Sequence, residues 1–244
     1  MKKILLVTGG GRGIGAATCR VAAQAGYAIA VNYHSDKNAA ENLANEIGGL
    51  AIQADVSKPE DVSRMFAEIA SKLGTITHVV NSAGITGKSS RLVDADLEII
   101  RQTLDTNLFG TILISREAVK RMSTKLGGLG GVIVNISSGA ASIGSANEFV
   151  WYAASKAAID TFTLGLGREV AEEGIRVVAV APGLIDTELH ARSTGEPGRV
   201  ERMRDVIPMK REGAADEVAK TILFLLSEEA SYITATTLRV SGGR

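Results

Sequence analysis

Cysteine, proline and aromatic residues are scarce in this chain of 244 residues, which has one Cys, four Pro and 4% aromatic residues. The single Cys19 excludes an internal disulfide and a metal site built on several cysteines, and it is typical of a reducing compartment. The 27 basic residues are balanced by 27 acidic ones, so net charge gives no general attraction to nucleic acid or to an anionic membrane. We therefore expect neither partner, and we expect a cytoplasmic protein.

Long apolar runs and histidine clusters are also missing. No stretch approaches the roughly 20 apolar residues that a membrane-spanning helix needs. The apolar run at residues 4–7 is too short for the apolar core of a signal peptide and leads directly into glycines. The three histidines, His34, His78 and His190, lack the spacing of metal ligands. We therefore predict no membrane span and no bound metal.

What the chain does have is 45% hydrophobic residues and 27 glycines, with apolar strand patterns alternating with helical ones. Strands are expected at 4–8, 28–33, 50–54, 78–81, 132–136, 176–181 and 237–240. Helices are expected at 14–25, 38–47, 59–72, 96–125 with a bend near Thr106, 150–173 and 215–226. This order predicts an α/β fold: a single Rossmann-type, doubly wound domain over 1–244, with a parallel sheet of about seven strands and helices on both faces. The longer segment around 185–208 is typical of a substrate lid.

A glycine-rich loop, Thr8-Gly9-Gly10-Gly11-Arg12-Gly13-Ile14-Gly15, lies between the first expected strand and the first helix. Residues without side chains let a backbone approach a pyrophosphate, and the N-terminus of the following helix points free N–H groups at it. The position of the loop after a strand and before a helix indicates a dinucleotide cofactor.

The end of the second expected strand bears on the choice of cofactor. NAD-binding sheets usually place an acid there, but this chain has Asn32, His34 and Ser35, and Asp36 comes late. Arg12 in the glycine loop is suited to pair with a 2′-phosphate. The pattern favours NADP; the alternative is that Asp36 turns inward and selects NAD.

Further motifs follow in order along the chain, and with the glycine loop they resemble the short-chain dehydrogenase/reductase family over essentially its whole length. The matching positions are Thr8, Gly9, Gly13 and Gly15 in the loop; Asp55-Val56; Asn81-Ser82-Ala83-Gly84, where Ser82 departs from the usual asparagine; Asn107; Ser138; Tyr152 and Lys156 in Y-x-x-x-K; and Pro182-Gly183 with Thr187. The cofactor contacts expected from loop and resemblance are Thr8, Gly9, Gly11, Arg12, Gly13, Ile14, Gly15, Asn32, His34, Ser35, Asp55, Val56, Asn81, Ala83, Gly84, Tyr152, Lys156, Pro182, Gly183, Ile185 and Thr187.

Tyr152 and Lys156 are four residues apart, so they share one face of a helix. An ammonium group beside a phenol lowers its pKa from about 10, which prepares Tyr152 as an acid/base. The resemblance implies that Ser138 binds the substrate oxygen, with Ser137 as the alternative register. It also implies that Lys156 holds the nicotinamide ribose and that Asn107 holds a water that relays protons.

The resulting hypothesis is an oxidoreductase that transfers a hydride between NADP and a small carbonyl or secondary alcohol substrate. Within the family the chain looks similar to glucose dehydrogenase-like members and to 3-oxoacyl-carrier-protein reductases; Glu172 and Glu173 argue against an acidic carrier protein. An alternative of another class is an NADP-binding sensor without turnover. The resemblance also implies a homotetramer or homodimer, with the helices at 96–125 and 150–173 as interfaces. Trp151 is assigned to the core or to such an interface.

Overall fold

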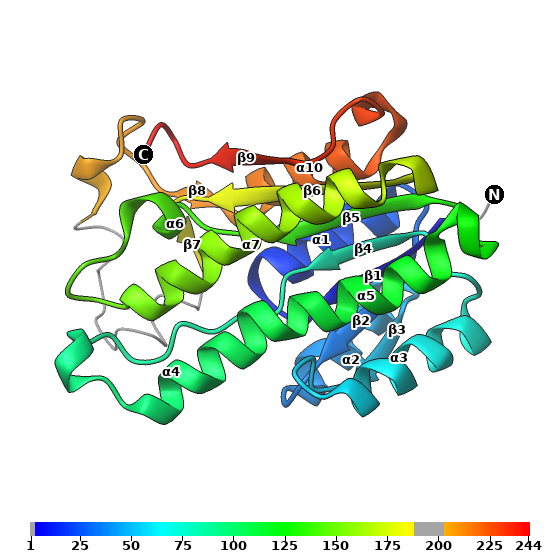
Figure 1. The fold of residues 1–244 in the computed structure, drawn as a ribbon, viewed down its shortest axis with the longest axis horizontal. Helices are drawn as coiled ribbons and strands as arrows, with labels where there is room; N and C mark the ends of the chain where they lie inside the picture. Colours follow the sequence, from blue (N-terminus) through cyan, green and yellow to red (C-terminus); the bar gives the residue numbers. More distant parts are fainter. Residues whose placement is uncertain (1–2, 188–202) are drawn as a thin grey trace.

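Seven parallel strands form the centre of the protein in a computed structural model that describes residues 3–187 and 203–244 (Figure 1). The strands, in sheet order, are β3 (Leu50–Gln53), β2 (Ala28–Tyr33), β1 (Ile4–Thr8), β4 (His78–Asn81), β5 (Gly131–Ile136), β6 (Ile175–Pro182) and β9 (Thr236–Val240). Every neighbouring pair runs parallel. The order reverses direction at β1, where the chain leaves for β2 on one side and β4 on the other. The predicted doubly wound sheet is thus confirmed.

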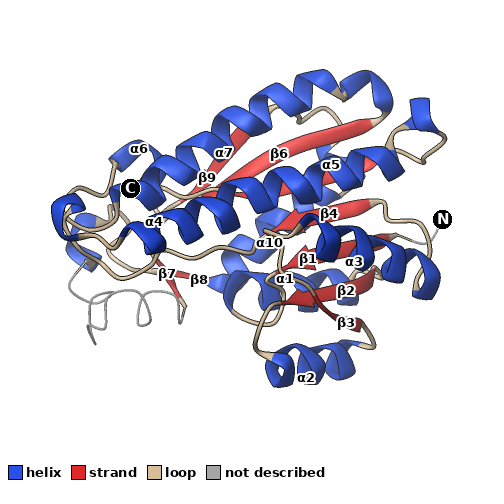
Figure 2. Ribbon diagram, turned by 60° about the horizontal axis from the view of Figure 1, so that its bottom comes forward, coloured by secondary structure: helices blue, strands red, loops and turns tan. Residues whose placement is uncertain are grey.

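Helices cover both faces of this sheet (Figure 2). They are α1 (Gly13–Gln24), α2 (Lys37–Ile47), α3 (Pro59–Lys72), α4 (Leu97–Leu104), α5 (Gly110–Met122), α6 (Ala140–Ile143), α7 (Val150–Glu169) and α10 (Ala215–Leu226). Leu5 and Val7 of β1 point to a core shared with α1, α2 and α10, whereas Ile4 and Leu6 point to one shared with α3 and α5. Because successive strand residues face opposite sides, a fully apolar strand is explained by burial on both faces.

The helix expected over 96–125 is divided in the structure. Between α4 and α5 the five residues Asp105–Phe109 form a π-helical turn, and a short 3-10 turn over Thr124–Leu126 follows α5. The predicted bend near Thr106 is therefore a change of helix type, of the kind often found at functional sites. α5 then begins at Gly110, where a Cβ atom would lie 2.8 Å from Val56 Cγ2.

Only the ends of the predicted lid, 185–187 and 203–208, are among the described residues. β7 (Ile185–Asp186) pairs with β8 (Gly213–Ala214) in a separate two-stranded sheet, and Arg204–Val206 form a 3-10 turn. His190 lies outside the described residues. Across 3–187 and 203–244, no helix is long and apolar enough to pass through a bilayer, and no three His, Cys, Asp or Glu side chains gather as a metal site would require.

Candidate active site

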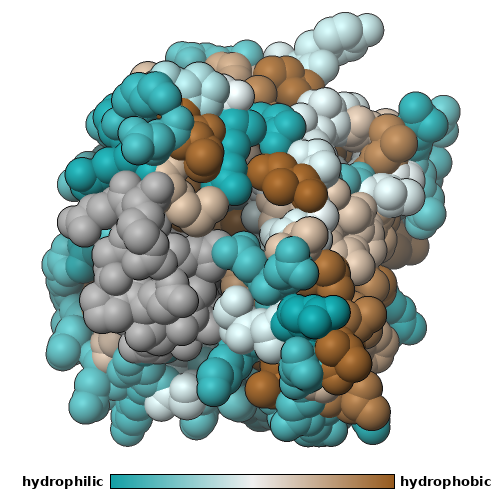
Figure 3. Space-filling model, turned by 90° about the vertical axis from the view of Figure 1, so that its left-hand side faces the viewer, coloured by the Kyte–Doolittle hydropathy of each residue, from teal (hydrophilic) through white to brown (hydrophobic). Residues whose placement is uncertain are grey.

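A cavity of about 950 Å³ opens where the strands end. Its walls come from the glycine loop after β1, the segment after β4, the segment from Ser137 to Ala140 after β5, α7, and the segment from Pro182 to Thr187 after β6. The cavity therefore sits over the reversal of strand order, the place where doubly wound sheets bind their ligands. Figure 3 shows the corresponding face, with apolar patches separated by polar side chains.

The glycine loop has the shape of a cradle for an anion. A Cβ atom at Gly15 would lie 2.5 Å from the Gly9 carbonyl oxygen, and Gly9 and Gly13 have positive φ angles of 61° and 52°. α1 begins at Gly13 without a side-chain cap and without an acid in its first turn. The first turn of α1 therefore offers N–H groups without an acid of its own, which fits the pyrophosphate of a dinucleotide. Gly9, Arg12, Gly13, Ile14 and Gly15 all line the cavity.

Some expected cofactor contacts lie behind this cradle. Thr8 Oγ1 accepts hydrogen bonds from Ser82 N (3.0 Å) and Ala83 N (3.1 Å), so β1 holds the segment after β4. Asn32 Oδ1 accepts from Gly9 N at 3.3 Å. Both side chains are buried and outside the cavity lining. In this position both side chains support the loop; their contact with a cofactor stays a prediction.

Three more expected cofactor contacts, Asn81, Gly11 and Val56, also lie outside the cavity lining. Asn81 donates to Asn135 Oδ1 at 2.9 Å and to Ser115 Oγ at 3.2 Å in the buried centre of the sheet. Gly11 lies against α2, where a Cβ atom would be 3.4 Å from Ala40 N. Val56 is buried against Gly110. In contrast, Ala83, Gly84, Pro182, Gly183, Ile185 and Thr187 line the cavity as expected.

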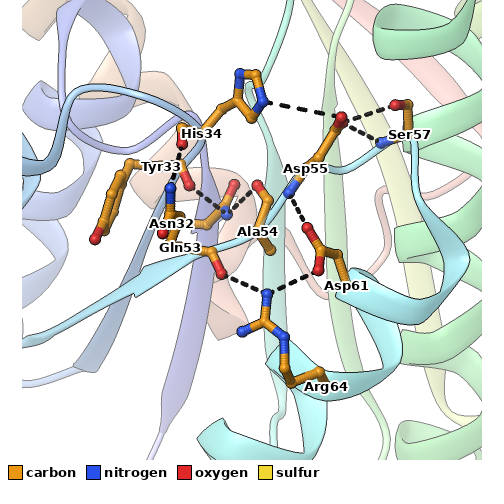
Figure 4. A network of polar contacts seen from close by, with 9 residues as sticks. All are labelled: Asn32, Tyr33, His34, Gln53, Ala54, Asp55, Ser57, Asp61 and Arg64. Atoms are coloured by element: carbon orange, nitrogen blue, oxygen red, sulfur yellow. Dashed lines mark hydrogen bonds and ion pairs between the residues drawn. The ribbon is translucent and has the colours of Figure 1, made fainter.

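The ends of β2 and β3 carry a polar network (Figure 4). Asp55 Oδ1 accepts from Ser57 N (2.9 Å) and Ser57 Oγ (2.7 Å), and its Oδ2 lies 3.9 Å from His34 Nε2. Asp61 accepts from Asp55 N, and this bond is the main reason why its pKa is lowered. His34 and Ser35 are exposed beyond the cavity lining. This network shapes the surface where the resemblance places adenine.

Tyr152 and Ser138 meet on the opposite side of the cavity. The Tyr152 phenol, on α7, lies beside the Ser138 hydroxyl; burial raises the pKa of the phenol, and the interaction with Ser138 lowers it to a lesser extent. Ser137 is buried instead, and its Oγ donates to the Lys156 carbonyl oxygen at 3.2 Å, so it fastens α7 to the end of β5. Of the two registers left open by the sequence, the structure pairs Ser138 with Tyr152.

Lys156 lies one turn further along α7. Its Nζ donates to Ile136 O at 2.7 Å and lies 5.8 Å from the centre of the Tyr152 ring. Burial lowers the pKa of Lys156 to about 8. The expected lowering of the Tyr152 pKa is therefore not found here, because burial outweighs the other influences on the phenol.

Asn107 is fully buried in the π-helical turn. Its Oδ1 accepts from Ile85 N at 2.8 Å, and its Nδ2 donates to Ile85 O (2.9 Å) and to Ser155 Oγ (3.1 Å). A Cβ atom at Gly84 would lie 3.3 Å from Asn107 Oδ1 and 3.5 Å from Lys156 Nζ. Asn107 thus joins the loop after β4 to α7 beside Lys156. Because both amide hydrogens are used, the carboxamide has none left to donate to a relay water.

Trp151 is buried outside the cavity lining and donates from Nε1 to Thr86 O at 2.9 Å, so it belongs to the core.

Several residues of the cavity wall were not singled out in the sequence. Phe149 packs edge-on against Tyr152, with ring centres 5.9 Å apart. Gln102 from α4 and Arg244 from the C-terminal segment also line the cavity. Only tertiary packing brings these distant segments together.

Comparison with known proteins places this site in a family. A model of the family described as "Enoyl-(Acyl carrier protein) reductase" matches residues 9–244. The chain is 50% identical to the uncharacterized oxidoreductase YgfF of Escherichia coli strain K12, over 99% of each chain. It is 40% identical to carbonyl reductase family member 4 of Danio rerio, over all of this chain and 98% of that one.

Among solved structures, the chain is similar to the 3-ketoacyl-(acyl-carrier-protein) reductase of Brucella melitensis complexed with NADH. The TM-score is 0.93 with 33% identity, over 99% of this chain and 98% of that one. The chain belongs to the short-chain dehydrogenase/reductase family and is an oxidoreductase.

Proposed function

We propose that the protein transfers a hydride between NADP and a carbonyl or secondary alcohol substrate, with Tyr152 as acid/base. The observation that carries this proposal is that Ser138, Tyr152 and Lys156 line the same cavity as the glycine cradle, with the Tyr152 phenol beside the Ser138 hydroxyl. The likeness to the Brucella melitensis enzyme, which is complexed with NADH, supports a nicotinamide cofactor.

Four residues of the site have distinct roles in the reduction of a carbonyl substrate. A bound nicotinamide supplies the hydride to the carbonyl carbon. Ser138 donates a hydrogen bond to the carbonyl oxygen as negative charge develops there, and Tyr152 gives that oxygen its proton, so that the alcohol leaves neutral. Lys156, cationic below its pKa of about 8, favours the phenolate that remains and holds the nicotinamide ribose. Asn107 positions the loop after β4 against Lys156.

The preference for NADP rests on Arg12. This side chain lines the cavity beside the cradle and is about one-third exposed, within reach of a 2′-phosphate. Asp36, the candidate that would select NAD, is occupied by Arg12 and by the first turn of α2. The carboxylate is therefore not free to accept the two hydroxyls of an adenosine ribose.

The test follows NADPH and NADH oxidation by the purified protein against a panel of carbonyl compounds, with Tyr152→Phe in parallel. We expect turnover that prefers NADPH and that falls by about 10³-fold in the variant, which keeps the ring but loses the proton donor. Tyr232→Phe, at a fully exposed position outside the cavity lining, is the matched control and should keep full activity. Turnover that survives Tyr152→Phe would overturn the role of Tyr152. Tight NADPH binding without turnover of any carbonyl or alcohol would favour the sensor alternative.

The likeness to an acyl-carrier-protein reductase keeps that substrate as a second candidate. Glu172 and Glu173 form a turn just before β6, at the end of the strands opposite the cavity (Figure 1). Because these acids do not line the cavity, they do not weigh against a carrier protein at this site. A direct binding measurement with an acyl carrier protein distinguishes this candidate from a small free substrate.

For the assembly we propose a homotetramer or homodimer in the cytoplasm. α4 and its surroundings expose apolar side chains: Leu97 is 80% exposed and Phe109 is 44% exposed. Exposed apolar side chains of this kind are suited to contact with a second subunit. Sedimentation of the wild-type protein and of Leu97→Glu tests this, because the charged variant should shift the protein toward the monomer.

A further inference from the structure

The C-terminal segment borders the cavity at the edge of the sheet far from the glycine loop. β9 is the last strand on that edge, and the chain end lies beside α6 in Figures 1 and 2. Gly183 N donates to Val240 O at 2.9 Å, and a Cβ atom at Gly183 would lie 2.7 Å from Ser241 Cα. Ser241 Oγ then donates to the Arg244 main-chain oxygen at 2.7 Å, which turns the segment toward the cavity. Arg244 is thereby held at the end where Ser138 and Tyr152 lie.

Among the residues that the structure describes, three cationic ones line this cavity, and two of them already have a role. Arg12 is paired with Asp36 at 2.9 Å beside the cradle. Lys156 donates to Ile136 O beneath Tyr152. The third, Arg244, is half-buried and makes no side-chain hydrogen bond or ion pair with the residues that the structure describes. A half-buried guanidinium without an acidic partner can bind an anion through charge-assisted hydrogen bonds.

The neighbouring Arg239 does not compete for this role. Its Nη2 donates to Ser142 Oγ at 2.9 Å and lies 3.7 Å from where a Cβ atom at Gly139 would be. Arg239 therefore ties β9 to α6, directly after Ser138, and it is outside the cavity lining. The acidic residue of the lining, Glu148, has an interaction of its own, and its carbonyl oxygen accepts from Ser90 N at 2.8 Å.

Apolar groups complete this end of the cavity, where Ile143, Phe149 and Met203 form the wall. We propose that Arg244 binds a carboxylate on the substrate, so that the protein acts on oxo acids and the corresponding hydroxy acids. This inference rests on the proposed function: the carbonyl lies at Ser138 and Tyr152, a short carbon chain crosses the apolar wall, and the carboxylate meets the guanidinium. A neutral ester of the same acid offers only weaker acceptors to that group.

The test compares 2-oxopentanoate and 4-oxopentanoate with their methyl esters, because the position of the oxo group places the carboxylate at a different distance from the carbonyl in the two acids. For at least one of the two acids, kcat/KM of the wild-type protein should be about tenfold or more higher than for its ester. Arg244→Met should lower kcat/KM for that acid about ten- to a hundredfold, mainly through KM, and should change the ester less than about threefold. Arg244→Lys should retain part of the preference.

Arg116→Met is the matched control, because it removes the same charge from an exposed position of α5 outside the cavity lining. It should change neither substrate. An equal loss for acid and ester in Arg244→Met, or a wild-type preference for both esters, overturns the inference.

Calorimetric titration of the two oxo acids into the protein gives a readout independent of turnover. Binding that weakens about tenfold in Arg244→Met supports the carboxylate site even if no carbonyl is reduced, in which case the proposed function fails alone. Reduction of neutral carbonyls without any binding of the oxo acids has the opposite meaning: the function stands and the carboxylate site fails.

Discussion

Arg12 and Asp36 form an ion pair in which Arg12 Nη1 lies 2.9 Å from Asp36 Oδ2. The other carboxylate oxygen, Oδ1, accepts a hydrogen bond from Ala39 N at 3.1 Å, so Asp36 also caps α2. One side chain thus holds the helix and neutralises the arginine that a 2′-phosphate would need. A 2′-phosphate must replace Asp36 as the partner of Arg12.

Replacing Asp36 with Asn tests this competition. Asn caps a helix about as well as Asp, so α2 should persist while the negative charge disappears. We expect the Kd for NADPH to fall about three- to tenfold, because a repulsive charge is removed from a partly exposed site. The Kd for NADH should change less than about twofold, as measured by quenching of protein fluorescence. A large loss of NADH binding with NADPH unchanged would instead identify Asp36 as a ribose ligand and NAD as the cofactor.

Substitution of the two adjacent serines after β5 by alanine should have different effects: one should lower activity and the other should lower stability. Ser138→Ala removes the partner of Tyr152 and should lower kcat about 10²- to 10³-fold with little change in the free energy of unfolding. Ser137→Ala removes the bond to the buried Lys156 carbonyl and should cost about 1 kcal/mol of stability while keeping most of the activity. Steady-state kinetics and urea unfolding of both variants check this. The assignment is reversed if Ser137→Ala is the inactive one.

Asn32 should be needed for both stability and cofactor binding. Its Nδ2 donates to Ala54 O at 3.1 Å and to Ile52 O at 3.4 Å, while its Oδ1 holds Gly9 N. Asn32→Leu keeps a similar volume but leaves these buried groups without their partner, so we expect a loss of about 2–4 kcal/mol in urea unfolding. Asn45→Leu, at an exposed position of α2, is the control and should stay within about 0.5 kcal/mol of the wild type. Equal effects of the two substitutions would show that Asn32 has no special role.

His78 should make the protein sensitive to acid. Burial, with a smaller contribution from Lys3, lowers the pKa of His78 to about 4 from 6.5. The unfolded chain therefore takes up a proton at His78 between about pH 6.5 and pH 4 while the folded protein does not, and the free energy of unfolding falls as the pH is lowered through this window, by about 3 kcal/mol.

The His78→Gln variant isolates this contribution from the titration of carboxylates. Urea unfolding at pH 7, 5.5 and 4.5 should give a difference between variant and wild type that moves in favour of the variant as the pH falls. A difference that stays constant over this range would show that His78 is protonated in the folded protein as readily as in the unfolded chain.

Much of the fold could be predicted from local patterns. The apolar runs at residues 4–8 and 28–33 form β1 and β2 with the bounds expected from the sequence. These predictions succeed because a strand buried on both faces must be apolar throughout and because the glycine loop can only follow such a strand. The division of the long helical stretch before β5 could not be predicted in full. The π-helical turn at Asn107 goes with the contact to Ile85, which helix propensity does not reveal.

The candidate site shows the same division. Tyr152 and Lys156 could be predicted from the sequence, because two residues four positions apart in a helix lie on the same face. The sequence favoured Ser138 but left Ser137 as the alternative, since the choice depends on which hydroxyl lies beside the Tyr152 side chain and which bonds to the backbone of α7. The pKa of Tyr152 was expected to fall and instead rises, because the burial of the phenol is a property of the assembled cavity.

The sequence by itself determined the alternation of strands and helices that is typical of a doubly wound sheet, the position of the glycine loop, and the placement of Tyr152 and Lys156 on one helix face, because each follows from the spacing of neighbouring residues. Only the tertiary structure decided that Asn32 and Thr8 support the loop from behind, that Asp36 neutralises Arg12, and that Arg244 reaches the cavity. These relationships join residues far apart in the chain, and the packing of strand ends and loops brings them into contact.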